Sequence, residues 1–180
     1  MVGFMDKIFL SHSSKDKWYV SYIAEHFGKD KCVYDAMCFE AGMKNLDEIF
    51  REMGKTSIFV IFISENSLES CWVKKELAIA DERLNNDPYK LLQIFPIIID
   101  PAISHNDSRI PDFLKTGFGS YNIKVITSNI VAYRKIRWFQ RKRTFENNLH
   151  LQKMDTFFME GTKKYQILKK NLTLERVLGF

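Results

Sequence analysis

Short apolar runs alternate along the chain with segments whose apolar residues recur every three or four positions. The most apolar run, Ser57 to Ile63 (SIFVIFI), is rich in β-branched and aromatic side chains. Such a run is typical of a central strand covered on both faces, as in a parallel sheet. Pro96 lies in a later run and lacks a backbone donor, so we expect that strand to be interrupted there or to lie near an edge. The expected strands are residues 7–11, 32–34, 57–63, 91–99 and 121–126.

Helical periodicity fills most of the intervals between these runs. The S-x-x-D pattern of residues 13–16 predicts a capping box that starts the first helix. Apolar residues from Tyr19 to Phe27 then follow at helical spacing, and Gly28 is a natural helix end. Further helices are expected at residues 46–54, at about 68–84 and after Ser128, with loops at residues 35–44 and 100–120.

The order of these elements predicts the fold class. Strands that alternate with helices form a parallel α/β sheet with right-handed crossovers. We therefore expect a flavodoxin-like five-stranded parallel sheet, of strand order 2-1-3-4-5, with helices on both faces. Residues 1–150 are expected to form the main domain and residues 151–180 a C-terminal helical extension.

Composition narrows the class of protein. Hydrophobic residues make up 46% of the 180 residues, which excludes disorder as the main state. No apolar run approaches the roughly 18 residues that span a bilayer, and the N-terminus does not resemble a secretory signal. Three cysteines without C-x-x-C spacing favour reduced thiols in a cytoplasmic protein over a disulfide framework or a metal site. The net charge of +5 is modest.

Polar side chains follow three of the expected strands. Parallel sheets bind ligands beyond the carboxyl ends of their strands, where the strand order reverses. The first strand ends at Ser11 and His12, the second at Tyr34 and Asp35, and the third at Ser64. We expect these groups to converge on one rim of the sheet.

Three common chemistries of such a rim can be excluded. The first loop, SHSSKD, has no glycine, which argues against a phosphate-cradling loop. A phospho-receiver domain needs an acidic pair after the first strand and an aspartate after the third, where this chain has Ser11-His12 and Ser64. Adjacent side chains on a strand diverge, so Ser11 and His12 do not form a nucleophile and base pair.

Trp72 and Glu76 form the remaining candidate, at the start of the helix expected around residues 68–84. Residues four apart stack on one helix face, which places an aromatic ring beside a carboxylate at the sheet rim. The same spacing also occurs in helices that only pack there.

Several motifs in the right order resemble the TIR (Toll/interleukin-1 receptor) family over about residues 6–130. They are KIFLSHSSKD (7–16), VYD (33–35) with Gly42, FIS (62–64) with CW (71–72), WVKKEL (72–77) and FPI (95–97). The segment MCFE (37–40) is less basic than many "BB loops" of the family and lacks their proline, so its interface residues cannot be assigned.

The resemblance implies an enzyme that cleaves the nicotinamide–ribose bond of NAD⁺, with Glu76 as the catalytic carboxylate. NAD⁺ would be the substrate, and neither a cofactor nor a metal is expected. In the family, the BB loop gates the site and mediates assembly. The expected substrate-binding residues are Phe9, Ser11, His12, Tyr34, Asp35, Ser64 and Trp72.

A small stand-alone TIR protein is similar to bacterial anti-phage enzymes of the Thoeris type. That similarity implies an ADP-ribose-derived product, linear, cyclic or base-exchanged, which acts as a nucleotide messenger on a separate effector. It also implies self-association through TIR–TIR contacts. The alternative is a non-catalytic TIR scaffold that acts by assembly alone.

The segment from Tyr133 to Arg143 interleaves cations with aromatic residues. This pattern can bind nucleic acid through phosphate contacts and stacking. We favour a solvated helix face with Ile136 and Phe139 pointing inward, and we expect neither nucleic acid nor a membrane as a partner.

Overall fold

The computed structural model describes residues 7–34, 46–86, 92–116 and 122–146. Its contacts divide the chain into two units, residues 1–140 and 141–180, and each is described by itself. In the second unit, residues 141–146 are helical. The predicted extension at residues 151–180 lies outside the described residues, so the boundary near residue 150 stays a prediction.

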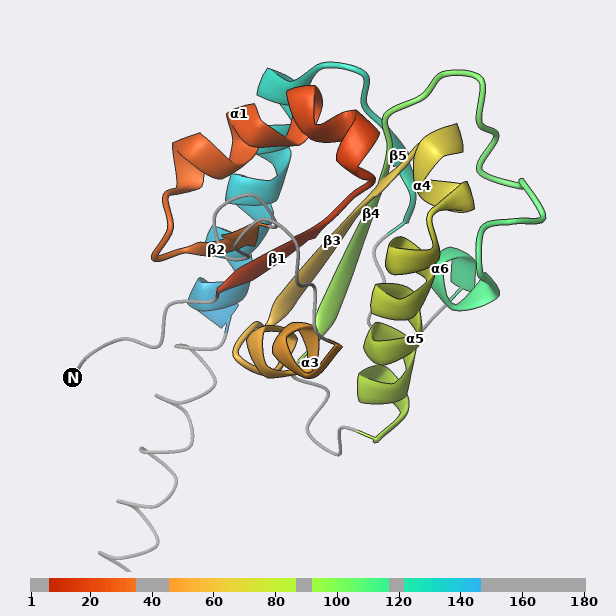
Figure 1. The fold of residues 1–180 in the computed structure, drawn as a ribbon. Coiled ribbons are helices and arrows are strands. Elements are labelled where there is room, and N and C mark those ends of the chain that lie inside the picture. The colour runs from red at the N-terminus through yellow and green to blue at the C-terminus, as the bar shows by residue number, and fades with distance from the viewer. Residues whose placement is uncertain (1–6, 35–45, 87–91, 117–121, 147–180) are drawn as a thin grey trace, which may run out of the picture. The chain divides into compact units, whose positions relative to one another are not determined.

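A five-stranded parallel sheet forms the centre of the first unit (Figure 1). Its strand order is β2-β1-β3-β4-β5, and every neighbouring pair is parallel. The predicted flavodoxin-like α/β fold is therefore confirmed. The strands are β1 (Ile8–Ser11), β2 (Cys32–Tyr34), β3 (Ile58–Ile63), β4 (Gln93–Ile98) and β5 (Lys124–Val125).

Pro96 lies within a continuous β4, so of the two predicted alternatives the strand is not interrupted but lies near an edge, next to the edge strand β5. The amides of Gln93 and Ile99 donate to the carbonyl oxygens of Ser57 and Ile63 on the β3 side, and the alternation along a strand turns the nitrogen of Pro96 toward the β5 side. There, β5 pairs with β4 only from Ile97 onward. The missing donor of Pro96 thus lies where the ladder with β5 has not yet begun, which is why a proline is tolerated.

Two apolar clusters cover the two faces of the sheet. On one face, α1 (Lys17–Phe27) and the helical residues 129–140 pack against alternate strand residues (Figure 1). On the other face lie α3 (Leu46–Gly54), α5 (Cys71–Asn86) and α6 (Asp112–Thr116). Alternation along each strand sends successive side chains to opposite faces, which is how one strand serves both clusters.

Two helices of the structure differ from the sequence prediction. The helix expected at about 68–84 is two helices, α4 (Glu65–Glu69) and α5, because Ser70 has an extended backbone with ψ of 120°. The loop expected at residues 100–120 contains the short helix α6, which follows Pro111. Proline favours such a position because a helix start does not need its missing N–H.

The predicted capping box at Ser13 and Asp16 is also different in the structure. The Ser13 side chain accepts from the Lys15 amide and caps the short 3₁₀ helix η1 (Ser14–Asp16). α1 begins only at Lys17, and its N-cap Asp16 makes no side-chain capping bond. The Asp16 carboxylate is instead used across the fold. Gly28, with a positive φ of 80°, ends α1 as predicted.

Tyr19 joins the beginning of the sheet to its end. Its hydroxyl donates to the carbonyl oxygen of Ile126 at 2.6 Å, across 107 residues of sequence. Burial raises the pKa of the Tyr19 phenol well above its usual value, so it remains a donor.

None of the described helices is both long and apolar enough to cross a membrane.

Candidate functional site

Ser11 and Glu76 meet at the carboxyl end of β1. The Ser11 hydroxyl donates to Glu76 Oε2 at 2.6 Å. Both residues are buried, with only 6% of Glu76 exposed. Phe9 and Ser11 share the strand face that packs against α5, and this alternation aims the Ser11 hydroxyl at the helix. A buried carboxylate with a short hydrogen bond from a hydroxyl is fixed in position.

Trp72 lies one helical turn before Glu76 on α5, as predicted. Its ring is half-buried against the apolar cluster on this face. The exposed Lys75 places its Nζ 4.5 Å from the ring centroid. This cation–π contact already covers one face of the indole. A substrate ring stacked on that face would have to displace the Lys75 ammonium.

His12 turns to the opposite side of the strand from Ser11. Its ring stacks on that of Tyr34 at the end of β2, with centroids 5.0 Å apart and planes 20° apart. His12 Nδ1 lies 3.1 Å from the carbonyl oxygen of Leu10, which can only accept. That bond therefore puts a proton on Nδ1. The predicted divergence of Ser11 and His12 is confirmed, and with it the exclusion of a nucleophile and base pair.

A second buried carboxylate lies at the same rim. Asp16 is 5% exposed and accepts at Oδ2 from the Ser64 hydroxyl, at 2.5 Å, and at Oδ1 from the Asn66 amide, at 3.1 Å. Ser64 caps α4 at the same time, because its oxygen accepts from the Ser67 amide. Ser64 thus serves the framework that joins η1 to α4. The sequence pattern carried no signal for this pairing beyond the local capping motif.

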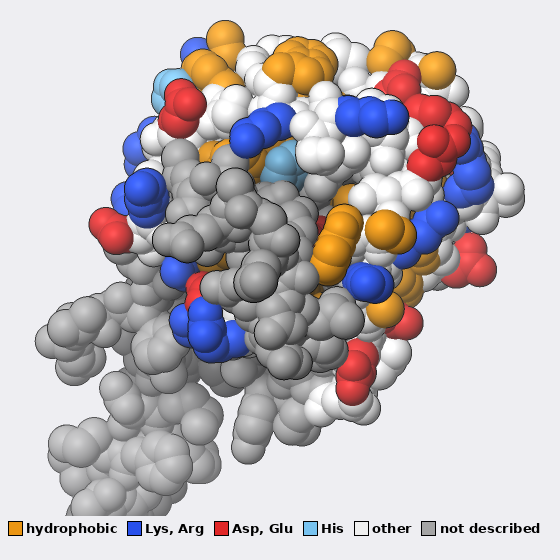
Figure 2. All heavy atoms as spheres, viewed as in Figure 1, with side chains coloured by type: hydrophobic (Ala, Val, Ile, Leu, Met, Phe, Trp, Pro, Cys, Tyr) orange, Lys and Arg blue, Asp and Glu red, His pale blue; other side chains and the backbone are white. Residues whose placement is uncertain are grey.

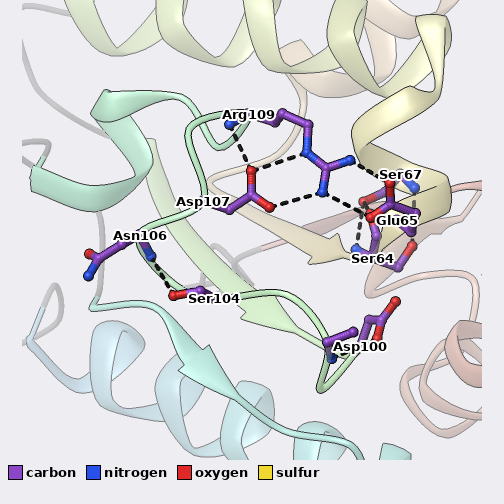
Figure 3. Close-up of polar contacts among 9 residues, drawn as sticks. Ser64, Glu65, Ser67, Asp100, Ser104, Asn106, Asp107 and Arg109 are labelled. Carbon is purple, nitrogen blue, oxygen red and sulfur yellow. Dashed lines mark hydrogen bonds and ion pairs between the residues drawn. The ribbon is translucent and has the colours of Figure 1, made fainter.

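An ion-pair cluster holds the segment after β4 against α4 (Figure 3). The Arg109 guanidinium bonds the Glu65 carboxylate through two nitrogens and also the Asp107 carboxylate. Hydrogen bonds from Arg109 lower the pKa of Asp107 to about 2, and its side-chain bond lowers the pKa of Glu65. The Arg109 and Glu65 side chains are exposed and Asp107 is partly buried, so these surface ion pairs orient the segment more than they stabilise the fold.

The structure therefore brings part of the predicted site together. Ser11, Glu76 and Trp72 form one group, and His12 and Tyr34 form a neighbouring one.

Positive and negative side chains are interspersed over the described part of the face in Figure 2, in keeping with the modest net charge.

Two other predicted site residues, Phe9 and Asp35, are not part of these groups. Phe9 is buried and stacks on Phe59 at 5.6 Å, below the rim, so its contact with a substrate stays a prediction. Asp35 lies outside the described residues, as does the whole predicted BB loop. Glu76 does not line either of two cavities that the described residues form, of about 250 Å³ and about 760 Å³. The crevice expected beside Glu76 stays a prediction, because residues 35–45 lie outside the described residues.

The smaller cavity, of about 250 Å³, lies on the side of α5 that carries Lys74, Ala78 and Asp81, away from Glu76. Apolar side chains of β3, α4, α5 and α6, with Ile110 and Pro111, line most of it, and Lys74, Asp81 and Arg109 are among its polar residues. Among the described residues, no group of three or more His, Cys, Asp or Glu side chains could hold a metal ion. The described cysteines, Cys32 and Cys71, form no disulfide.

Comparison with known families places this rim in context. The family model of the TIR domain matches residues 8–123, well over half of the chain. The protein belongs to the TIR-domain family. The match runs from β1 to the residue before β5 and includes Ser11, His12, Tyr34, Ser64, Trp72 and Glu76. No curated protein matches the chain. TIR domains include NAD-cleaving enzymes and scaffolds, and they commonly self-associate.

Proposed function

We propose that this TIR domain is an NAD⁺ nucleosidase or ADP-ribosyl cyclase with Glu76 as its catalytic carboxylate. The observation that carries the proposal is the buried Glu76 carboxylate at the sheet rim, held by the Ser11 hydroxyl at 2.6 Å. The rim is where parallel sheets of this topology bind ligands. The motif that contains Trp72 and Glu76 is also the part of the chain that resembles catalytic members of the family.

The proposed reaction breaks the bond between the ribose C1′ and the nicotinamide nitrogen. The bonding electron pair leaves with nicotinamide, which becomes neutral and needs no proton. Positive charge then develops on the ribose, as in glycoside hydrolysis. Water adds to C1′ and loses a proton to give ADP-ribose, or a nucleophile within the substrate adds and loses a proton to give a cyclic isomer.

Glu76 acts electrostatically in this scheme. A negative charge held in a site of low polarity stabilises a developing cation more strongly than it would in water. A carboxylate has about four acceptor positions, so in the proposed complex ribose hydroxyls can donate to Glu76 alongside the Ser11 bond. Removing such a group costs on the order of 100-fold or more in rate.

The neighbouring groups have proposed roles in binding. Trp72 offers an aromatic surface one turn from the carboxylate, and His12 with Tyr34 offers polar groups for ribose or phosphate. Asp35 and Phe9 are kept as substrate-side residues on the strength of the resemblance. Ser64 is bonded to the framework acid Asp16, and its direct contact with the substrate remains part of the proposal.

The product and its use rest on the family resemblance. We propose that the ADP-ribose-derived product is a nucleotide messenger for a separate effector in bacterial anti-phage defence of the Thoeris type, with self-association of the TIR domain assembling the active form in the cytoplasm.

The test is cleavage of NAD⁺ by purified full-length protein at high concentration, followed by chromatography of nicotinamide and mass spectrometry of the nucleotide product. We expect nicotinamide release from the wild type and at least a hundredfold slower release from Glu76→Gln. Glu82→Gln is the matched control, because Glu82 is an exposed glutamate on the same helix and should leave the rate unchanged.

Equal rates for the wild type and Glu76→Gln would remove Glu76 from the proposed role. Absence of turnover in the wild type, with self-association measured by light scattering, would favour the alternative function of a TIR scaffold. Mass spectrometry distinguishes the linear, cyclic and base-exchanged products by their masses and retention times.

A further inference from the structure

A groove of about 760 Å³ lies between β5 and the helical residues 129–140, and all of its lining residues belong to the first unit. Its volume falls in the range of small-molecule sites, about 300–1,000 Å³. It shares no lining residue with the rim that carries Ser11 and Glu76. The lining residues are Phe95, Lys124, Val125, Ile126, Thr127, Ser128, Val131, Arg134, Lys135 and Trp138.

The charged side chains that line this β5 groove are all positive. They are Lys124 from β5 and Arg134 and Lys135 from the helix, and each is exposed. None of the three forms an ion pair with another residue in the described ranges. Cations that converge on a concave surface without acidic neighbours raise the local concentration of anions.

An aromatic ring accompanies these cations. Trp138 is 58% exposed and lines the groove one turn after Arg134 and two turns after Val131. This spacing places them on one face of the helix. The inward face is separate, because Ile136 and Phe139 are buried in the sheet cluster as the sequence predicted. The groove therefore combines an exposed indole with guanidinium and ammonium groups.

The start of the helix adds polar donors at the end of the groove. The Ala132 amide donates to the Ser128 carbonyl, which makes this the first turn. Thr127 and Ser128 line the groove there with exposed hydroxyl side chains. The amides of a first turn lack partners within the helix and favour negative charge.

We propose that the β5 groove binds a nucleotide, with the base stacked on Trp138 and the phosphates held by Lys124, Arg134 and Lys135. Stacking on an aromatic ring and phosphate contact with cations are the two interactions that bind nucleotide units without base selectivity. The bounded volume of the groove favours a free nucleotide over a long strand. This site is independent of NAD⁺ cleavage at Glu76.

Isothermal titration calorimetry of the full chain with ATP, without magnesium, tests the proposal. We expect saturable binding that weakens as salt increases, because phosphate contacts release counterions. Adenosine keeps only the base and ribose of ATP, and inorganic tripolyphosphate keeps only the phosphates. Each should bind at least tenfold more weakly than ATP. A single-stranded oligothymidylate distinguishes the source of the nucleotide, since it binds more tightly than ATP only when the groove serves nucleic acid.

Matched variants locate the site. Arg134→Glu with Lys135→Glu should weaken ATP binding at least tenfold, whereas the same charge change at the exposed Lys29 and Lys31 should leave it within twofold. Trp138→Ala should weaken it about tenfold, and Trp18→Ala, which removes the 70% exposed indole of α1, should not.

Circular dichroism of each variant checks that it is folded. Failure of ATP to bind the wild type would overturn the proposal, and so would tighter binding of oligothymidylate than of ATP, because the groove would then serve nucleic acid and not a free nucleotide. Equal weakening by the groove and control variants would overturn it as well, because binding would then follow net charge and not the groove.

Discussion

The two buried carboxylates at the sheet rim, Glu76 and Asp16, are alike in burial and different in what holds them. Each is at most 6% exposed, and each accepts a hydrogen bond from a serine hydroxyl at or just after the carboxyl end of a strand. Asp16 has both oxygens engaged by residues of α4 and its N-cap, so it joins two local structures. Glu76 projects from a long helix beside the indole of Trp72.

Burial and a serine partner are common to both carboxylates, so they do not by themselves distinguish a catalytic acid from a framework joint. The assignment of Glu76 therefore also depends on its position at the end of β1 and on the motif with Trp72 that resembles catalytic members of the family. Two measurements distinguish the two carboxylates. Loss of the Asp16 carboxylate should mainly lower the free energy of unfolding, and loss of the Glu76 carboxylate should mainly lower the rate of NAD⁺ cleavage.

The largest expected effect is on the rate of the Glu76→Gln variant. We expect NAD⁺ cleavage to fall at least a hundredfold while the free energy of unfolding changes by less than about 1 kcal/mol, because the amide oxygen can still accept from Ser11. Urea denaturation beside the chromatographic assay measures both. Active-site groups are often not optimal for stability, so a small gain in stability fits the same interpretation. A large loss of stability would instead make Glu76 a structural acid like Asp16.

Asp16→Ala should give the reverse result. It removes the acceptor for Ser64 and Asn66 at a buried position, and we expect a loss of about 3 kcal/mol in the free energy of unfolding. The cleavage rate per folded molecule should change much less than in Glu76→Gln. Asp30→Ala, at an exposed position, is the control for urea denaturation. An unchanged stability would refute the framework role.

Ser11→Ala probes the bond that the two roles share. Loss of a hydrogen bond to a buried charge should cost about 1.5 kcal/mol of stability and slow cleavage roughly tenfold through poorer positioning of Glu76. We expect kcat to fall with little change in KM. Ser11→Thr keeps the hydroxyl and should recover much of the rate. A KM effect alone would assign Ser11 to substrate contact.

The smallest expected effect concerns the Arg109 cluster. Because the pKa values of Asp107 and Glu65 are lowered in the folded protein, their contribution to stability is present above the unfolded values. It is lost for Asp107 as the pH falls through about 2, and for Glu65 as the pH falls through its own lowered pKa. Arg109→Ala should therefore lower Tm slightly at pH 6, and its difference from the wild type should shrink between about pH 4 and pH 2. A Tm difference that stays constant over this range would contradict the cause assigned to the pKa shifts. Lys31→Ala serves as the control for charge.

The strands and their order were predictable because a buried parallel strand must be apolar on both faces, as the run from Ile58 to Ile63 is. The helix break at Ser70 was not, since a serine is compatible with a helix and only its extended backbone reveals the break. For Pro96 the sequence left two alternatives open, because the cost of a proline depends on which neighbour its nitrogen faces, and this follows from register and not from composition.

The candidate site was predictable only in part for a similar reason. The i, i+4 spacing gave the Trp72–Glu76 face, and the alternation along β1 gave the divergence of Ser11 from His12. The partners of Asp16 lie 48 and 50 residues away, and no local pattern carries such a pairing. Lys75 over Trp72 likewise depends on a rotamer that spacing does not specify.

The bond from Tyr19 to Ile126 has a consequence for synthesis on the ribosome. The first helix of the chain emerges long before its phenol can find the carbonyl at the end of the sheet, so this bond cannot form until 107 further residues have been made. Contacts this distant in sequence slow folding because a long loop must close first. The Tyr19 side chain is therefore expected to be among the last groups of a nascent chain to reach its native, buried position.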